Sequence, residues 1–140
     1  SLTAGDGIYA GLLVASLVAR NKREGGPTLH ELATAIPRYP QVIASAHLHA
    51  RVDLKAVDGL DTLTKETLAG FGGKGRVNLR FSGTEPNLLR AMVEGGPETT
   101  MREVIDRALA LCGMVAKATH TDSPKIDIVD CVTGEPIKVG

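Results

Sequence analysis

A chain of 140 residues with 43% hydrophobic and 23% charged residues is long enough for one domain with a hydrophobic core and too short for two full domains. Its 16 lysines and arginines balance its 16 aspartates and glutamates, which excludes a general attraction to nucleic acid or to an anionic membrane, so any anion site must be local. The two cysteines form no CxxC pair, and the most apolar stretch is shorter than the about 20 residues that span a bilayer, so we expect no zinc site, no membrane anchor and a cytoplasmic location.

The first predicted element is an apolar helix that follows a turn at residues 5–7. Asp6 is a suitable N-cap, and the run IYAGLLVASLVAR after it is apolar nearly all round. Such a helix needs a covering on most of its sides. The polar, glycine-rich segment Asn21–Pro27 marks a boundary between packed units. The chain also starts at Ser1 without a methionine, which suggests a fragment or a processed product, although an artificial start would look the same.

Helical and extended patterns alternate through the middle of the chain. Thr28 can cap a short helix that has Glu31 in its first turn and stops before Pro37. The predicted elements are a helix over Leu29–Ile36, a strand over Pro40–Val52, a helix over Asp61–Phe71, and strands over Arg76–Phe81 and Leu88–Glu94. In each of the last two strands apolar side chains alternate with charged or polar ones, so each has an apolar face and a polar face.

Residues Glu98–Lys117 carry apolar side chains at spacings of three and four, which predicts a long amphipathic helix. The tail after Thr119 has two short extended runs around Thr133-Gly134, and it could form a hairpin or a loose extension. The element order indicates an α+β domain, a small antiparallel sheet with helices on one face. We divide the chain into residues 1–24, residues 25–118 and a tail, residues 119–140, whose role is open.

The stretch between the last two predicted strands carries the most chemistry. A turn of Ser82, Gly83 and Thr84 can direct hydroxyl and backbone N–H groups at one point, which suits the several oxygens of a phosphate. Gly83 would let the backbone approach a ligand and would tolerate a positive φ. Arg80 and Arg90 lie on the polar faces of the two strands, so both guanidinium groups can reach the turn and bind an anion.

A plainer interpretation of the same residues stays open at this point. The Ser-Gly-Thr segment could be an ordinary β-turn, with both arginines on a solvated sheet face and Glu85 paired with one of them, since short motifs match by chance. His47 and His49 share a strand face and could bind a metal with a third ligand, but one pair is weak evidence.

The run RFSGTEPNLLRAMVEG resembles the last domain of the α-D-phosphohexomutase superfamily, in which an Arg-x-Ser-Gly-Thr-Glu-Pro loop holds the phosphate of the sugar substrate. The superfamily comprises phosphoglucomutases, phosphomannomutases and phosphoglucosamine mutases. GDGIYAGLLVASLVA is similar to the helix that closes its third domain, and LATAIPRYPQV to the lead into the fourth, as in phosphoglucosamine mutases. The resemblance covers about residues 5–118.

The resemblance implies a fold like that of the TATA-binding protein for residues 25–118 and makes residues 1–24 the terminal helix of the preceding domain. It implies a mutase that moves phosphate between the 1- and 6-positions of a hexose or hexosamine phosphate. By position, it implies phosphate contacts from Arg80, Ser82, Gly83, Thr84 and Arg90, with Glu85 and Asn87 in supporting roles. We expect Glu85 to orient an arginine, because two anions repel.

The family transfers phosphate through a phosphorylated serine and a Mg²⁺ held by an Asp-Gly-Asp-type loop, and neither pattern occurs in this sequence. We therefore expect no catalytic residue and no metal ligand in this chain, Mg²⁺ in the full-length enzyme only, and no turnover from the chain alone. The expected partners are a phosphosugar and the other mutase domains. A non-catalytic module that binds a sugar phosphate or another anion, or that serves in assembly, is the alternative, and the identity of the sugar stays open.

Overall fold

The computed structural model describes residues 5–139, so Ser1–Ala4 of the expected first segment lie outside the described residues. The chain divides into two compact units after Arg38. This division falls downstream of the Asn21–Pro27 segment, so the short second helix goes with the first unit. The assignment of the first unit to a preceding domain stays a prediction.

The first unit consists of two helices. α1 (Gly7–Glu24) starts as expected at Asp6, whose carboxylate accepts hydrogen bonds from two backbone N–H groups of the first turn, each at 3.0 Å. α2 (Leu29–Thr34) has the expected capping box between Thr28 and Glu31. Across residues 5–139, no helix is both long and apolar enough to cross a lipid bilayer.

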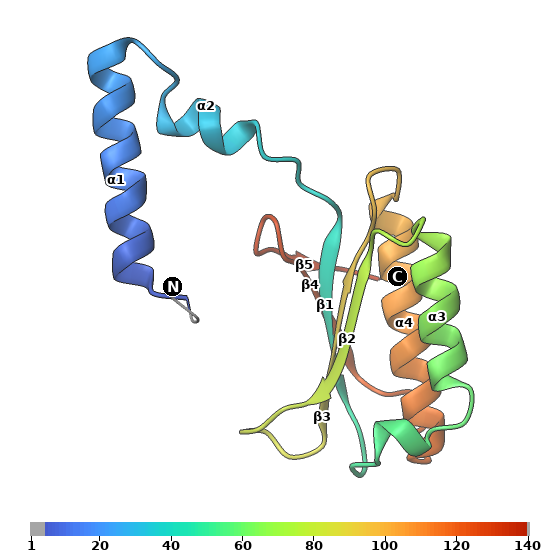
Figure 1. Cartoon of the computed structure of the whole chain (residues 1–140). Coiled ribbons are helices and arrows are strands. Elements are labelled where there is room, and N and C mark those ends of the chain that lie inside the picture. The colour runs from blue at the N-terminus through green and yellow to red at the C-terminus, as the bar shows by residue number, and fades with distance from the viewer. Residues whose placement is uncertain (1–4, 140) are drawn as a thin grey trace. The chain divides into compact units, whose positions relative to one another are not determined.

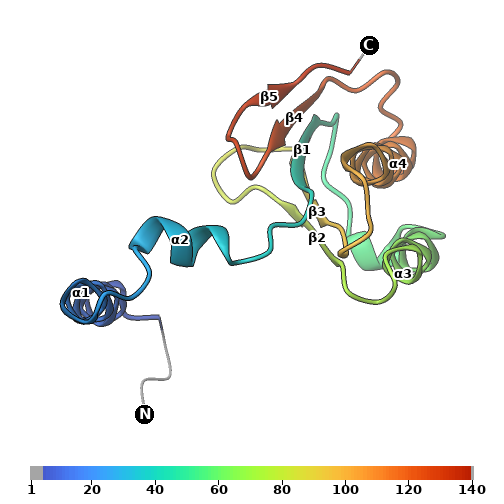
Figure 2. The same cartoon turned by 90° about the horizontal axis from the view of Figure 1, so that it is seen from above.

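The second unit is an antiparallel five-stranded sheet in the order β2-β3-β1-β4-β5. Figures 1 and 2 show α3 and α4 together on one face of it, which confirms the expected α+β architecture. Its elements are β1 (Gln41–His47), the 3-10 turn η1 (Leu54–Ala56), α3 (Leu60–Gly70), β2 (Arg76–Phe81), β3 (Leu88–Glu94), α4 (Met101–Ala118), β4 (Ile126–Asp130) and β5 (Pro136–Ile137).

The core lies between the sheet and α4, and it follows the alternation seen in the sequence. One face of each central strand is fully buried, and the apolar side of α4 packs on it. The buried side chains include Val42, Ala44, Ala46, Leu89, Ala91, Val93, Val104, Ala108, Leu111 and Val115. The opposite face of the sheet carries most of the charged side chains of the strands, Arg76, Arg80, Arg90, Glu94 and Asp127.

Some boundaries differ from the sequence expectations for local reasons. The strand expected over Pro40–Val52 ends at His47, because the next backbone N–H donates to the β2–β3 loop and no longer to a strand. The helix expected from Glu98 begins at Met101, where Thr100 and Glu103 form a capping box. Of the two alternatives for the tail, the structure has the hairpin, β4 and β5.

Candidate anion-binding site

The face of the sheet that points away from the helices carries a row of polar side chains across four strands. In the strand register, Arg80 on β2 lies opposite Arg90 on β3. Arg90 lies opposite Ser45 on β1, and Ser45 opposite Asp127 on β4. Side chains directly opposite each other on neighbouring antiparallel strands have Cβ atoms roughly 4.5–5.5 Å apart. The two arginines predicted to converge therefore lie side by side.

The two arginines line a small hollow in this face. Its other lining residues are Ile43, Asn78 and Met92, and its volume is about 130 Å³. Since a water molecule takes up about 30 Å³ of the liquid, the hollow has room for an ion of a few heavy atoms. Its floor is apolar and its only charges are the two guanidinium groups, so an anion is the ligand that fits it.

The charges around this hollow are unbalanced. The Glu85 carboxylate lies 3.6 Å from the Arg90 guanidinium, and both side chains are about half exposed. Among residues 5–139, no carboxylate lies within ion-pair distance of Arg80. Like charges directly opposite each other destabilise a strand pair. The arrangement therefore costs stability unless an anion lies between the arginines.

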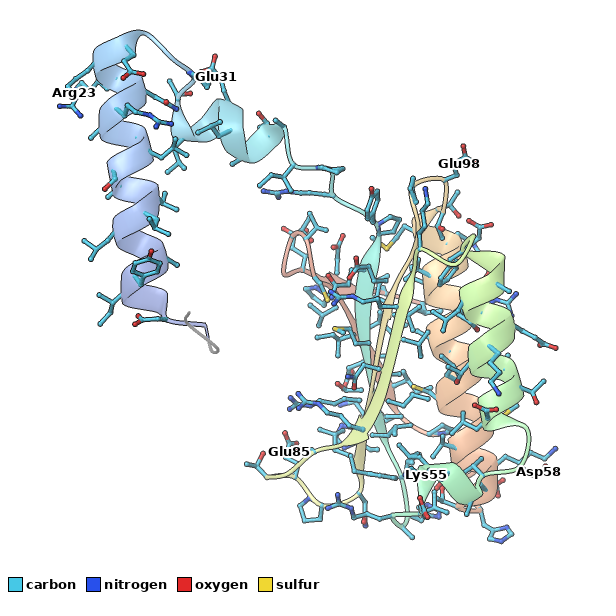
Figure 3. All side chains as sticks on the ribbon, viewed as in Figure 1. Arg23, Glu31, Lys55, Asp58, Glu85 and Glu98 are labelled. Carbon is cyan, nitrogen blue, oxygen red and sulfur yellow. The ribbon has the colours of Figure 1, made fainter. Side chains whose placement is uncertain are left out.

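The loop from Ser82 to Asn87 joins β2 to β3 at this end of the sheet, and Figure 3 shows Glu85 at its tip. Ser82 is only 6% exposed, and its backbone N–H donates to the Leu88 carbonyl at 2.8 Å. Its Oγ accepts long hydrogen bonds from the N–H groups of Thr84, at 3.4 Å, and of Glu85, at 3.2 Å. These two amides therefore point toward Ser82 inside the loop.

The Ser82 hydroxyl can still donate one hydrogen bond to a ligand. An oxygen that accepts two N–H groups still has its own hydrogen to donate, and Thr84 Oγ1, 3.4 Å away, is its nearest described partner. Thr84 and Gly83 are both exposed. The exposed surface of the loop thus presents Thr84 and the Gly83 backbone.

Gly83 could tolerate a positive φ but does not adopt one. The left-handed residue of the loop is Asn87, with a φ of 59°, a conformation that asparagine adopts more readily than most residues. A Cβ added at Gly83 would meet nothing within 4 Å, so no steric constraint within the described chain requires glycine there. A glycine at this position would still allow a ligand to approach the backbone closely.

Asn87 fixes the base of the loop to the end of β1. Its carbonyl accepts the Leu48 N–H at 3.0 Å, and its side-chain Nδ2 donates to the His49 carbonyl at 3.1 Å. His49 lies beyond the end of β1, and His47 Nε2 lies 3.8 Å from the Asp127 carboxylate. Among residues 5–139, no three His, Cys, Asp or Glu side chains are grouped so that they could hold a metal ion.

Sequence reasoning missed the residues that β1 and β4 add to this face. Ser45 joins the arginine row through the pairing of β1 with β3, and Asp127 joins it because β4 pairs with β1 over Val42–Ala46. The alternation in IDIVD was the local signal for that strand. The cysteines are poor nucleophiles, because burial raises the pKa of Cys112 to about 12 and raises that of Cys131 as well.

A larger hollow of about 490 Å³ lies beside the C-terminus of α3 and the start of α4. Lys74 is its only cation, and Glu98 and Glu103 also line it. Figure 3 places Glu98 at the end of the sheet opposite Glu85. This hollow does not suit an anion, so we assign the candidate site to the smaller one.

Comparison with known proteins agrees with this geometry. Residues 40–111 match the family model of the phosphoglucomutase/phosphomannomutase C-terminal domain. The phosphoglucosamine mutase of Methylococcus capsulatus is 44% identical over 116 residues, which are 83% of this chain and 24% of that protein. Those of Proteus mirabilis and Vibrio cholerae are 40% and 41% identical over 105 and 102 residues, in each case 22% of the relative.

The chain thus spans about a quarter of the length of these relatives. The family match begins just before β1 and includes β2, the Ser82–Asn87 loop, β3 and the first part of α4. It ends before β4 and β5. The arginine pair and its loop fall inside the matched region, and the chain belongs to the family of phosphoglucomutase/phosphomannomutase C-terminal domains.

Proposed function

We propose that this chain is the substrate-phosphate-binding domain of a phosphohexomutase, and that its ligand is the phosphate of a hexosamine phosphate. The observation that carries the proposal is the Arg80–Arg90 pair, two cations directly opposite each other on an open sheet face. The names of the relatives, phosphoglucosamine mutases, favour the hexosamine over the other sugars of the superfamily.

The proposed ligands differ in what they contribute. Arg80 and Arg90 each offer a planar set of donors that matches two phosphate oxygens, and such charge-assisted hydrogen bonds contribute about 1.5–3 kcal/mol each. The Ser82 and Thr84 hydroxyls and the Gly83 backbone would contact the remaining oxygens. The dianion would also relieve the repulsion between the two guanidinium groups. Glu85 would hold Arg90 in place without touching the phosphate.

In a mutase, this domain would position the substrate and would not carry out the chemical step. Phosphoryl transfer depends on positioning and on neutralising the charge of the phosphoryl group. The serine and the Mg²⁺ expected for the family would come from other domains. The residues described in this chain do not fit a Mg²⁺ site, because they offer no cluster of ligands, so their proposed part is limited to holding the phosphosugar.

We further assign α1 to a domain that precedes the sheet unit in the longer protein. None of the residues of α1, all of which the structure describes, is buried. Ile8, Leu12 and Leu13 are 81%, 63% and 54% exposed, more apolar surface than a single soluble helix normally presents. Adding the upstream residues should bury these side chains and abolish concentration-dependent self-association of the chain in analytical ultracentrifugation.

The ligand class can be tested with the 140-residue chain by two-dimensional ¹H–¹⁵N NMR. Glucosamine 6-phosphate and inorganic phosphate should shift the backbone signals of Gly83 and Thr84, whereas glucosamine without phosphate should leave them unchanged. If glucosamine alone shifted these signals as strongly as its phosphate, the site would not be a phosphate site.

The enzymatic part needs the longer protein. The chain alone should show no interconversion of glucosamine 1- and 6-phosphate, and clear turnover would refute its role as a positioning domain only. In the longer protein, Arg80→Ala should raise the KM for the phosphosugar. A chain that bound the phosphosugar as tightly alone as within the longer protein would favour the alternative, a stand-alone sugar-phosphate module.

A further inference from the structure

The segment that follows α4 lies outside the family match, which ends at residue 111, yet it is linked to the base of the phosphate loop through the residues after β1. The end of β1 lies between them. The Leu48 N–H donates to the Asn87 carbonyl in the loop, and the next N–H, of His49, donates to Thr121 Oγ1 in the tail, each at 3.0 Å. The His49 carbonyl in turn accepts the Asn87 side chain at 3.1 Å.

The hydroxyl groups of the tail form a chain with one possible direction. Thr119 Oγ1 lies 3.2 Å and 3.0 Å from the Val115 and Ala116 carbonyls at the end of α4, so its hydrogen is directed at the helix. Thr121 Oγ1, 2.9 Å from Thr119 Oγ1, must therefore donate to it. That leaves the Thr121 oxygen to accept the His49 N–H, as observed. The chain ends on the Val115 and Ala116 carbonyls, which also accept the backbone N–H of Thr119.

The position of this chain is tightly determined. Thr119 and Thr121 are 9% and 7% exposed, so water does not readily replace the hydrogen bonds between them. The residues on either side of the Thr121 turn, His120 and Ser123, have positive φ values of 51° and 48°. Non-glycine residues stay in that region only where the surroundings hold them. The segment is therefore a rigid support next to β1.

We infer that Thr121 is a positioning residue for the phosphate loop: its hydroxyl ties the loop, through His49 and Asn87, to the end of α4. That this loop binds phosphate rests on the proposed function, but the link from Thr121 to the loop does not. Asn87 keeps a left-handed backbone at the point where the loop enters β3. Without a fixed His49 carbonyl, the Asn87 side chain would lose the partner that holds it there.

The link matters because the hydrogen bonds at the tip of the loop are weak. Within the loop, the two hydrogen bonds to Ser82 Oγ are long, at 3.4 Å and 3.2 Å. A loop held so weakly loses conformational entropy when it binds a ligand, and prior ordering reduces that cost. Thr121 would thus raise phosphate affinity without touching the ligand.

The test compares Thr121→Val and Thr121→Ser in the 140-residue chain. Valine has a similar shape but lacks the hydroxyl, and serine retains the hydroxyl. We expect Thr121→Val to speed amide hydrogen exchange at Leu48 and Glu85 and to weaken inorganic phosphate binding roughly fivefold, the factor for one net hydrogen bond. Thr121→Ser should restore both.

Thr67→Val is the matched control. Thr67 is also fully buried in the second unit, and its hydroxyl has no hydrogen-bond partner among the described residues. The same substitution there should leave loop exchange and phosphate binding unchanged. If Thr121→Val leaves both readouts at the unmodified chain's values, or if Thr67→Val changes them equally, the inference is wrong.

A second variant covers the case in which Thr121→Val fails to fold. Asn87→Gly permits the left-handed backbone and removes the side-chain bond to His49, at a position outside the core. It should also speed exchange at Glu85, and unchanged exchange would contradict the link. Amide exchange is measured without ligand. If the unmodified chain binds no phosphate, the proposed function is wrong, but the exchange rates still show whether Thr121 orders the loop.

Discussion

The two ends of the β2–β3 ladder place an arginine on the same face of the same strand in opposite electrostatic settings. At one end, Arg76 lies opposite Glu94, and its Nη2 is 3.2 Å from the carboxylate. At the other end, Arg80 lies opposite Arg90. Both pairs are cross-strand neighbours, so geometry does not distinguish them; only the charge of the partner does.

The difference fits a structural role for one end and the ligand-binding role that we propose for the other. The Arg76–Glu94 pair is compatible with strand pairing and can contribute a small stabilisation. The Arg80–Arg90 pair opposes strand pairing, and it lies beside an exposed loop and a hollow of about 130 Å³. Sites that sacrifice stability in this way are typically functional.

The largest effect expected from this comparison is on anion binding. Arg80→Ala should weaken inorganic phosphate binding about 10- to 100-fold, because it removes a charge-assisted interaction of about 1.5–3 kcal/mol. Arg76→Ala, on the same strand and the same face, should leave the affinity unchanged. Isothermal titration calorimetry at low salt measures both, and equal losses would remove the distinction between the two ends.

Ser82→Ala should have a smaller effect, also confined to the loop end. The substitution deletes the acceptor of the Thr84 and Glu85 amides and the hydroxyl proposed to donate to phosphate. We expect roughly fivefold weaker phosphate binding, corresponding to about 1 kcal/mol. The Glu94 and Gly95 backbone NMR signals at the far end should not move. If this variant bound phosphate as tightly as the unmodified chain, Ser82 would have only a structural role in the turn.

Folding stability should respond to the two arginines with opposite signs. Arg76→Gln removes an attraction and should lower the free energy of unfolding by about 0.2–1 kcal/mol. Arg80→Gln removes a repulsion and should leave the free energy unchanged or raise it by a few tenths of a kcal/mol. Urea unfolding without phosphate measures both. The difference should shrink in 1 M salt, and a stability loss in Arg80→Gln would show that the arginine pair is not strained.

The smallest expected effect is a pH dependence of folding stability near the Arg76–Glu94 end. Near the Arg76–Glu94 end, α4 begins with a capping box in which hydrogen bonds from the Thr100 backbone and side chain hold the pKa of Glu103 below its ordinary value of 4.5. A lowered pKa means that Glu103 stabilises the folded chain above that value and loses this contribution as the pH falls through its folded pKa.

The variant Glu103→Gln should therefore be less stable than the unmodified chain at pH 6, and the two should converge toward pH 3. Urea unfolding at the two pH values measures this. Thr64→Ala, which removes a hydroxyl that donates to a helix carbonyl and is not a titrating group, serves as a pH-independent control. A gap between Glu103→Gln and the unmodified chain that stays constant with pH would contradict the role of the Glu103 charge.

The strands that carry the arginines were predictable because their signal is local. Residues 76–81 and 88–94 alternate with period two, so their bounds and faces follow from the sequence and agree with β2 and β3. The Thr28–Glu31 capping box was predictable for the same reason. The Thr100–Glu103 capping box was not predicted, because Pro97 also suits a first helical turn and placed the expected helix start too early.

The rest depends on contacts between residues far apart in the sequence. Asp127 joins the arginine row only through the pairing of β4 with β1, and Thr121 reaches His49 across 72 residues. The inward orientation of the Thr84 and Glu85 amides depends on the rotamer of Ser82, and the left-handed residue of the loop is Asn87 and not Gly83. Motif spacing contains none of this information, since one motif is compatible with several loop conformations.

The most direct measurement follows the arginine side chains themselves. In a titration of the 140-residue chain with inorganic phosphate, the side-chain Nε–Hε NMR signals of Arg80 and Arg90 should shift together along one binding curve, and the Arg76 signal should stay in place. An Arg76 shift as large as the other two, or unmoved Arg80 and Arg90 signals at saturating phosphate, would contradict the assignment of an anion site to this pair.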